Sequence, residues 1–346
     1  MVDAMTPRER VIRAVTFGTP DRIPLKHNIT GAAVIKHGRA LLDILDRYPD
    51  DYGTDTSFAK LMEQRQAAGS RLDKDEERTD EWGCVWRVRQ DGMMGQVVRH
   101  PLADWRALAA YKLPPAPEPT PDVVEKKRQQ LSERMKTYYT YGGGAWIWER
   151  MQLLRGDVDI MIDLMDRRPE VGELADLLFD HAKRAMTPGL LAGCDGVDIG
   201  DDWGNQEQLR INPRLWREFF KPRYRKLFAF LHGHNAHIRF HSCGHILEIL
   251  PDLIEVGADI INIQSSCMPM DDLARACRGK VCLEVDIDRQ YEMPYGAPAD
   301  VRRRAKTCFD TLASPEGGFI WLTEIGPDVP LKNVEAYYQV CRELSG

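Results

Sequence analysis

The chain has 346 residues, of which 43% are hydrophobic and 29% charged, a balance that is typical of a globular protein with a large core. Its formal net charge is −6 and it has no run of Lys or Arg, which disfavours a nucleic acid or an anionic membrane as its partner. No apolar stretch reaches the roughly 18 residues of a membrane span, the N-terminus lacks a secretory signal, and the cysteines are irregularly spaced. We therefore expect a cytoplasmic protein with free thiols.

The first 130 residues are expected to form helices and short strands that pack on the main unit. Residues 6–9 (TPRE) predict a helix start, with Thr as the N-cap and Pro at the first helical position. Residues 82–98 contain three glycines and predict short strands and turns. Residues 114–121 hold several prolines and predict a stiff, extended connector.

From residue 131 to 346 the chain alternates short apolar strands with helical stretches. The strands are predicted at residues 136–141 (ending at Gly142-Gly143-Gly144), 195–200, 236–243, 259–263, 281–285 and 318–322. This alternation predicts a parallel sheet that is buried by helices, either closed into a barrel or open. We expect one domain over residues 1–346.

Polar side chains follow most of these strands, and they favour the barrel. They are Asp201, Asp202, His241, Cys243, Gln264, Glu284, Asp286 and Glu324. In a (β/α)8 barrel the carboxyl ends of all strands surround one mouth, which would bring these groups together. Helix capping explains any single acid, but it explains the whole set less well. The predicted fold is therefore an α/β TIM barrel with an N-terminal embellishment.

His241-Ser242-Cys243-Gly244 is the sharpest local signal in the sequence. Residues i and i+2 of a strand point to the same side, so His241 and Cys243 can hold one metal ion, and an imidazole with a thiolate suits zinc. A lone pair of this kind is more commonly a buried His and a buried Cys in a core. Glu324 is our first choice for the third ligand. The alternatives are the thiols Cys267 and Cys282 and the carboxylates Asp202 and Asp286.

Nine short motifs, in the same order along the chain, resemble the uroporphyrinogen decarboxylase superfamily. They are residues 5–11 (MTPRERV), 19–24 (TPDRIP), 80–86 (DEWGCVW), 100–105 (HPLADW), 200–204 (GDDWG), 212–216 (NPRLW), 240–245 (FHSCGH), 294–298 (PYGAP) and 326–330 (GPDVP). The resemblance implies a TIM barrel and one of two activities. One is decarboxylation of uroporphyrinogen without a cofactor; the other is zinc-dependent methyl transfer involving a corrinoid protein.

The two branches differ in features that can be read from this sequence. The decarboxylases have an Arg-rich N-terminal motif, and the matching residues 23–40 contain no Arg cluster. His241 and Cys243 match the zinc pair of the methyltransferases, whose usual third ligand, a Cys, corresponds here to Thr323. The neighbouring Glu324 could supply an oxygen ligand instead, which would make the zinc a harder Lewis acid.

The resemblance therefore implies a zinc-dependent methyltransferase. It would exchange a methyl group with a corrinoid (cobalamin). The methyl donor would be a methoxylated aromatic, through O-demethylation, or a methylated amine; alternatively, a thiol would be the methyl acceptor. The chain has no Asp-x-His-x-x-Gly motif, so the corrinoid is expected on a separate partner protein. The expected zinc ligands are His241, Cys243 and Glu324; the catalytic acids Asp201, Asp202 and Asp286; and the substrate-binding residues Trp146, Trp203, Gln264 and Glu284. A cofactor-free lyase and a non-catalytic partner of a corrinoid protein are the alternatives.

Overall fold

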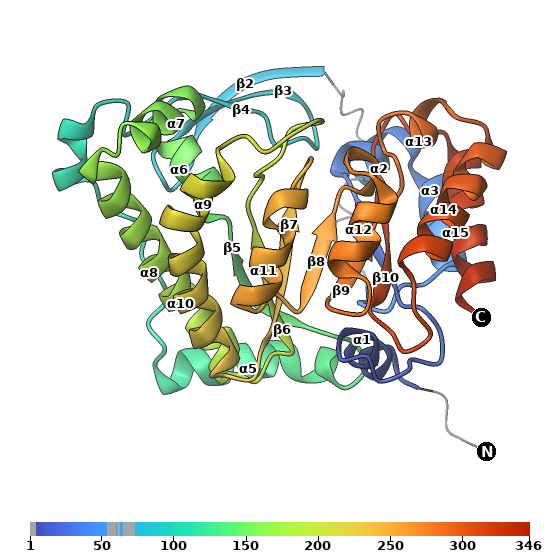
Figure 1. Ribbon diagram of the computed structural model, residues 1–346. Helices are drawn as coiled ribbons and strands as arrows, with labels where there is room; N and C mark the ends of the chain where they lie inside the picture. The colour runs from blue at the N-terminus through green and yellow to red at the C-terminus, as the bar shows by residue number, and fades with distance from the viewer. Residues whose placement is uncertain (1–4, 54–59, 61–62, 65–72) are drawn as a thin grey trace.

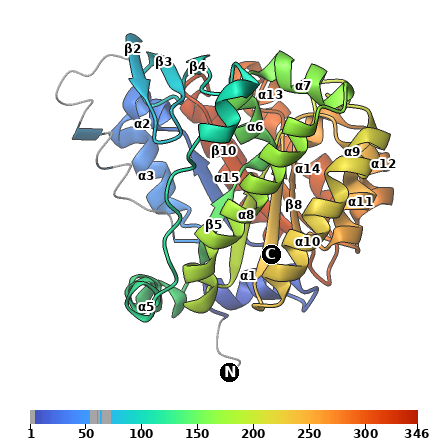
Figure 2. The same ribbon diagram turned by 90° about the vertical axis from the view of Figure 1, so that its left-hand side faces the viewer.

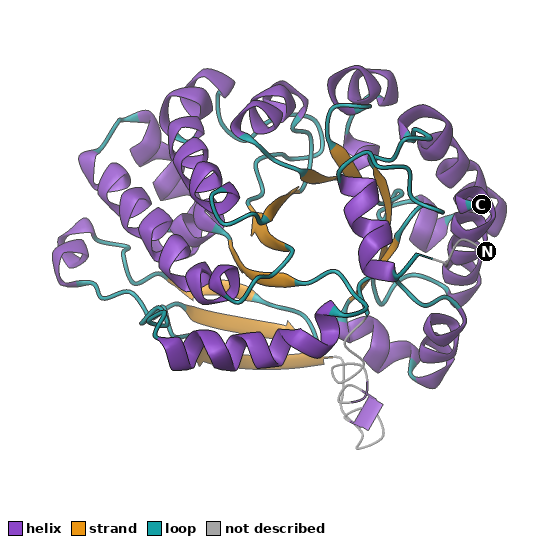
Figure 3. Cartoon of the chain, turned by 90° about the horizontal axis from the view of Figure 1, so that it is seen from below, coloured by secondary structure: helices purple, strands orange, loops and turns teal. Residues whose placement is uncertain are grey.

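A curved, parallel sheet forms the centre of the protein, whose computed structural model describes residues 5–53, 60, 63–64 and 73–346 (Figure 1). Its strands run in the order β1-β10-β9-β8-β7-β6-β5. Their bounds are β1 (Leu25–Ile29), β5 (Tyr141–Ala145), β6 (Gly196–Gly200), β7 (His237–Ser242), β8 (Ile260–Ile263), β9 (Cys282–Val285) and β10 (Phe319–Ile325). Seen along its axis, the sheet is enclosed by a ring of helices (Figure 3), and the predicted TIM-barrel class is confirmed.

Most helices lie on the outside of this sheet. They are α6 (Ile147–Arg155), α7 (Asp157–Met165), α8 (Pro169–Leu191), α9 (Pro213–Phe219), α10 (Lys221–His232), α11 (Leu250–Val256), α12 (Met270–Cys277), α13 (Glu292–Tyr295), α14 (Pro298–Leu312) and α15 (Leu331–Ser345). Short 3-10 turns occur at Trp105–Ala110, Leu247–Ile249 and Ser265–Cys267. In the part of the chain that the structure describes, no helix is both long and apolar enough to cross a lipid bilayer.

The N-terminal region contributes both to the barrel and to its two ends. It contains α1 (Pro7–Val15), α2 (Gly31–His37), α3 (Arg39–Arg47), α5 (Pro121–Met135) and an antiparallel sheet of β2 (Asp73–Thr79), β3 (Val85–Gln90) and β4 (Gln96–Arg99). The small sheet lies near the carboxyl ends of the barrel strands, and α1 and α5 lie at the opposite end (Figures 1 and 2). β1 pairs with β10, so this region also supplies a barrel strand that the sequence analysis did not anticipate.

Two local predictions in these regions have different outcomes. Thr6 is the N-cap of α1, and a capping box with Glu9 confirms the predicted helix start. The strand predicted at residues 136–141 is wrong, because β5 begins at Tyr141 and contains the three glycines. A Cβ on Gly142 would collide with Gly189 of α8 and with Cys194, so these glycines allow close packing of the strand rather than a turn.

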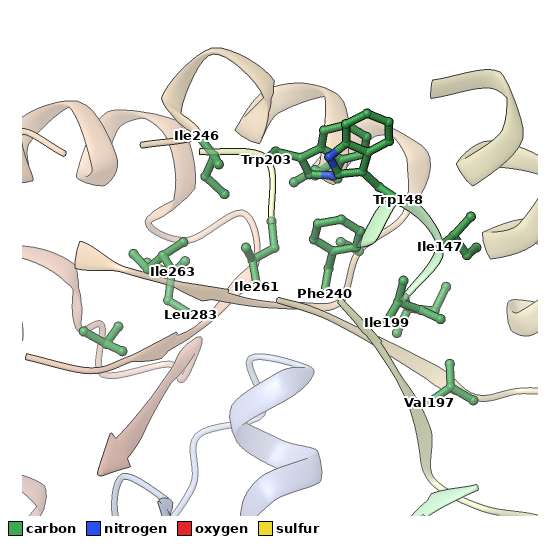
Figure 4. Packing of buried hydrophobic residues seen from close by; sticks show 14 of the residues in the cluster. Ile147, Trp148, Val197, Ile199, Trp203, Phe240, Ile246, Ile261, Ile263 and Leu283 are labelled. Carbon is green, nitrogen blue, oxygen red and sulfur yellow. The ribbon is translucent and has the colours of Figure 1, made fainter. Parts of the chain in front are cut away.

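The alternation of side chains along the strands separates an apolar core from a polar barrel interior. Val197, Ile199, Phe240 and Ile261 point outward and pack beneath the helices (Figure 4). The alternate positions of the same strands carry charged and amide side chains, which are described below. The main core therefore lies between sheet and helices. A smaller apolar layer with Ile260, Cys282 and Ile320 fills the lower end of the barrel, and the interior near the carboxyl ends of the strands is left for chemistry.

Candidate metal site and active-site cavity

A layer of paired charges forms the floor of the barrel mouth. Glu284 on β9 is completely buried and lies 2.8 Å from Lys26 Nζ and 2.6 Å from the Arg239 guanidinium. Arg239 also pairs with Asp198 at 2.7 Å. Burial alone would raise the pKa of Glu284, but the cations of Arg239 and Lys26 lower it to about 2. These groups neutralise one another, so the predicted substrate-binding residue Glu284 is engaged in the floor.

Above this floor, three potential metal ligands converge at the ends of β6 and β7. His241 Nε2 lies 3.4 Å from Cys243 Sγ and 3.4 Å from Asp202 Oδ1. All three potential ligand atoms lie within 4.8 Å of one another. The backbone N–H of Cys243 donates to Asp202 Oδ1 at 2.8 Å, which holds the carboxylate in place. Asp202 lies about forty residues before His241 and Cys243 in the sequence, and the parallel pairing of β6 with β7 brings them together.

The orientation of His241 is set by Asn262 on β8. The Asn262 side-chain amide donates to the backbone carbonyl of Glu284 at 2.9 Å, so its oxygen is the acceptor facing His241 Nδ1 at 2.5 Å. Arg239 donates to the same oxygen at 3.1 Å. His241 Nδ1 therefore carries a proton, and Nε2 is directed at Cys243 and Asp202.

The charge state of the three groups follows from their contacts. Burial lowers the pKa of His241, but hydrogen bonds to Asp202 and Cys243 outweigh it and raise that pKa to about 10. Burial raises the pKa of Asp202, but its hydrogen bond with His241 brings that pKa below its usual value. His241 is thus held in its charged form beside the Asp202 carboxylate, at a position where a metal cation can replace the proton.

The donor set fits zinc by its chemistry. An imidazole nitrogen, a thiolate sulfur and a carboxylate oxygen give three protein ligands, the number found in catalytic zinc sites that keep one position for a substrate. His241 and Cys243 also line a cavity of about 410 Å³. Trp146, Arg289 and Leu322 contribute further walls. A small molecule in this cavity would therefore lie beside the candidate metal site.

The end of β10 is arranged differently from the prediction. Glu324 lies in the same cavity, where its carboxylate contacts the Arg289 guanidinium and accepts from the Asn28 side chain at 3.2 Å. Thr323 points to the outside of the barrel and is hydrogen-bonded to Tyr338 Oη at 2.8 Å. The structure thus groups Asp202, rather than Glu324, with the His–Cys pair.

The two other predicted catalytic acids lie deeper than Asp202. Asp201 is completely buried, and its carboxylate accepts from the Glu149 backbone N–H at 3.1 Å and from the Tyr224 hydroxyl. Burial raises its pKa well above the usual value. Asp286 is also buried, which raises its pKa to about 7, and it lies 3.9 Å from Arg289 Nε. Asp201 braces the start of α6, and Asp286 borders the arginine of the mouth.

The predicted substrate-binding residues and alternative thiol ligands take diverse positions. Trp146 is 44% exposed and lines the cavity, whereas Trp203 is completely buried and stacked on Trp148. Gln264 accepts from the Gly244 backbone N–H at 2.8 Å and so supports the turn after Cys243.

The alternative thiol ligands are not grouped with His241 and Cys243. Cys282 is buried in a lower apolar layer, and Cys267 contacts Gln206.

The family model for uroporphyrinogen decarboxylase matches residues 95–344, which is most of the chain. The chain belongs to the uroporphyrinogen decarboxylase family. Among curated protein sequences, none matches this family member.

Solved structures add information about the fold of this family member. A methyltransferase from Methanosarcina mazei is 16% identical with a TM-score of 0.65, and the match covers 98% of this chain and 99% of that one. A Xanthomonas albilineans dihydropteroate synthase (16% identity, TM-score 0.29) is matched over 47% of this chain and 57% of that one. A Flavobacterium johnsoniae GH18 chitinase (10% identity, TM-score 0.31) is matched over 63% and 80%. The first similarity shows a shared fold along nearly the whole chain.

Besides the charged floor, the sequence analysis missed three residues that act on the candidate ligands of this family member's site. Asn262 orients His241, Arg289 contacts Cys243, and Glu149 lies near Asp202. Burial, and secondarily the charge of Asp202, raises the pKa of Glu149 to about 7. A polar residue inside the apolar segment 259–263 was a usable signal for Asn262. Arg289 and Glu149 lie in segments where charged residues are common, so their position could be found only in three dimensions.

Proposed function

We propose that this protein is a zinc-dependent methyltransferase that moves a methyl group between a small molecule and a corrinoid protein. The observation that carries the proposal is the convergence of Asp202, His241 and Cys243 beside the cavity, with His241 Nε2 directed at the other two ligands. Family membership and the fold shared with a methyltransferase from Methanosarcina mazei support it. The proposed third ligand is Asp202.

The proposed substrate is a methoxylated aromatic or methylated amine as methyl donor, or a thiol as methyl acceptor. Bound zinc would supply Lewis acidity, which polarises a methoxy oxygen or lowers the pKa of a thiol, and the corrinoid would supply the cobalt that exchanges the methyl group. The half-exposed indole of Trp146 gives the cavity an apolar surface for the organic part of the substrate.

The protein's own side chains would position the reacting groups and handle the proton. Asn262 keeps the proton on His241 Nδ1, so the imidazole keeps its orientation. The Glu149 carboxyl lies close to Asp202, and burial raises its pKa to about 7, so it would be a nearby group able to take up or release a proton. Trp146 and Leu322 cover the cavity wall and reduce the access of water.

Exposed apolar side chains on segments at the mouth end of the barrel support a protein partner. Met94 in the β3–β4 turn is 65% exposed, and Tyr291 and Tyr295 at α13 are 70% and 80% exposed. Both segments lie at the end where the barrel strands finish (Figure 1). Exposed aromatic and Met side chains are enriched at protein interfaces, and a corrinoid protein must approach this end to exchange a methyl group.

Metal content tests the proposal directly. Purified protein is loaded with Zn²⁺, dialysed, and measured by elemental analysis together with three variants: His241→Ala/Cys243→Ala, Asp202→Asn and Glu324→Gln. We expect about one zinc per chain in the wild type and in the Glu324 variant, none in the double variant, and clearly less than one in the Asp202 variant, which loses a charged ligand.

Activity then separates the proposed function from its alternative. Methoxylated aromatics, methylamines and thiols are offered together with a methyl-accepting or methyl-carrying corrinoid protein, before and after zinc is removed. Methyl transfer that needs zinc supports the proposal. A wild type that binds no zinc, or metal-free decarboxylation of uroporphyrinogen, would replace it with the lyase.

A further inference from the structure

The Arg289 guanidinium joins Cys243 and Glu324 across the mouth of the barrel. Arg289 Nη2 lies 3.0 Å from Cys243 Sγ, and Nη1 forms an ion pair with Glu324 Oε1. The side chain is only 21% exposed and comes from the loop that follows β9. A cationic side chain therefore contacts the same sulfur atom that would bind the proposed zinc.

The anchor of Arg289 does not depend on Cys243. Glu324 holds Nη1, and the other oxygen of Glu324 is in turn held by the Asn28 side chain at 3.2 Å. Asp286 Oδ2 lies 3.9 Å from Nε on the same side. Glu324 thus keeps the guanidinium in the mouth whether or not it contacts the sulfur, and Asp286 lies beside it. Because Arg stays protonated at all ordinary pH values, its charge cannot be removed when a metal arrives.

Zinc and the guanidinium compete for the same place. A zinc–sulfur bond is about 2.3 Å long, so an ion bound to Cys243 would stand only a few ångströms from Arg289 Nη2. Two cations at that separation repel each other strongly inside a protein. We propose that the Arg289 guanidinium occupies the metal-binding side of Cys243 Sγ and is displaced by the metal. It would thereby limit metal affinity and turn toward Glu324 and Asp286 when the site is filled. This inference rests on the proposed metal site and adds a residue that regulates its occupancy.

The test measures metal affinity rather than activity. Zn²⁺ dissociation constants are determined by competition with a chromophoric chelator, and Co²⁺ binding is followed by its thiolate charge-transfer absorption. Arg289→Met keeps the aliphatic stem and removes the charge, and Arg289→Gln serves the same purpose if the first variant folds poorly. We expect the Kd for both ions to fall at least about tenfold in either variant.

Two control variants show whether the effect is local. Arg289→Lys keeps a cation in the mouth and should leave the Kd within about threefold of the wild type. Arg155 has a similarly buried side chain, and its guanidinium lies 2.8 Å from the Asp163 carboxylate. This pair does not line the cavity, so Arg155→Met should not change the Kd. If the wild type binds zinc but the Met and Gln variants bind it equally or more weakly, Arg289 is not displaced and this inference fails alone. A wild type that binds neither ion overturns the metal site as well.

Discussion

Asn262 Oδ1 lies 2.5 Å from His241 Nδ1, and this contact determines which nitrogen of the imidazole faces the candidate metal site. The two residues lie opposite each other on the paired strands β7 and β8. Arg239 donates to the same oxygen, and the Glu284 carbonyl accepts from the amide nitrogen. The charged floor and the metal site are therefore connected through one side chain.

Replacement of Asn262 by Leu should weaken metal binding. The variant removes the acceptor for His241 Nδ1–H, and loss of such an outer contact typically costs about 10- to 100-fold in metal affinity. Chelator competition measures the Kd for Zn²⁺. Asn262→Asp keeps an acceptor at the same place and should bind zinc more tightly than the Leu variant. Equal affinity of both variants and the wild type would contradict the role of Asn262.

Replacement by Ala should affect stability at Trp203 and substrate binding at Trp146. Trp203 is completely buried against Trp148, so Trp203→Ala should lower the free energy of unfolding by about 3–5 kcal/mol. Trp146 is half-exposed in the cavity, so Trp146→Ala should change stability by no more than about 1 kcal/mol but raise the KM for the organic substrate. Urea unfolding and steady-state kinetics separate the two effects. An unchanged KM in the Trp146→Ala variant would show that the substrate does not contact this side chain.

Glu284→Gln should be strongly destabilising. Glu284 is the shared partner of Lys26 and Arg239, and its neutralisation leaves Lys26 without its carboxylate partner and Arg239 with Asp198 alone, at a cost of about 3–5 kcal/mol. Asp310→Asn removes one partner of an exposed pair with Lys306 and should cost no more than about 0.5 kcal/mol. Denaturant unfolding of both variants at neutral pH makes the comparison. Similar losses in the two variants would show that the floor is not a buried ion network.

Asp286 should make stability fall as the pH rises. Its pKa is about 7 in the folded protein because of burial, against an ordinary value of 3.8, so the folded state keeps a proton that the unfolded state releases between these values. The free energy of unfolding should therefore decline from pH about 4 to about 7, by at most about 1.4 kcal/mol per pH unit from this group, and level off above that range.

Asp286→Asn tests this dependence in metal-free protein. The variant lacks the titrating group, so its stability relative to the wild type should rise between pH about 4 and about 7. Asp310→Asn, at an exposed position, should follow the wild-type profile. A constant difference between the Asp286 variant and the wild type across this range would show that the carboxyl titrates normally.

The sequence by itself determined the class of fold and the first two members of the candidate site. Short apolar strands that alternate with helices predict a buried parallel sheet, and the polar residues at the strand ends favour its closure into a barrel. His241 and Cys243 were accessible because a strand brings residues i and i+2 to one side regardless of the rest of the chain. The predicted strand at residues 136–141 failed because glycines usually mark turns, whereas here they allow β5 to pack closely on α8.

The tertiary structure decided which residues accompany that pair. Asp202, Asn262 and Arg289 come from three different strand ends, and their distances to His241 and Cys243 depend on strand order and register. Glu324 lines the cavity, but its carboxylate pairs with Arg289, a partner that no local pattern predicts. Side-chain alternation follows from local backbone geometry and can be read along a strand, whereas the competition among charged partners is settled only where distant segments meet.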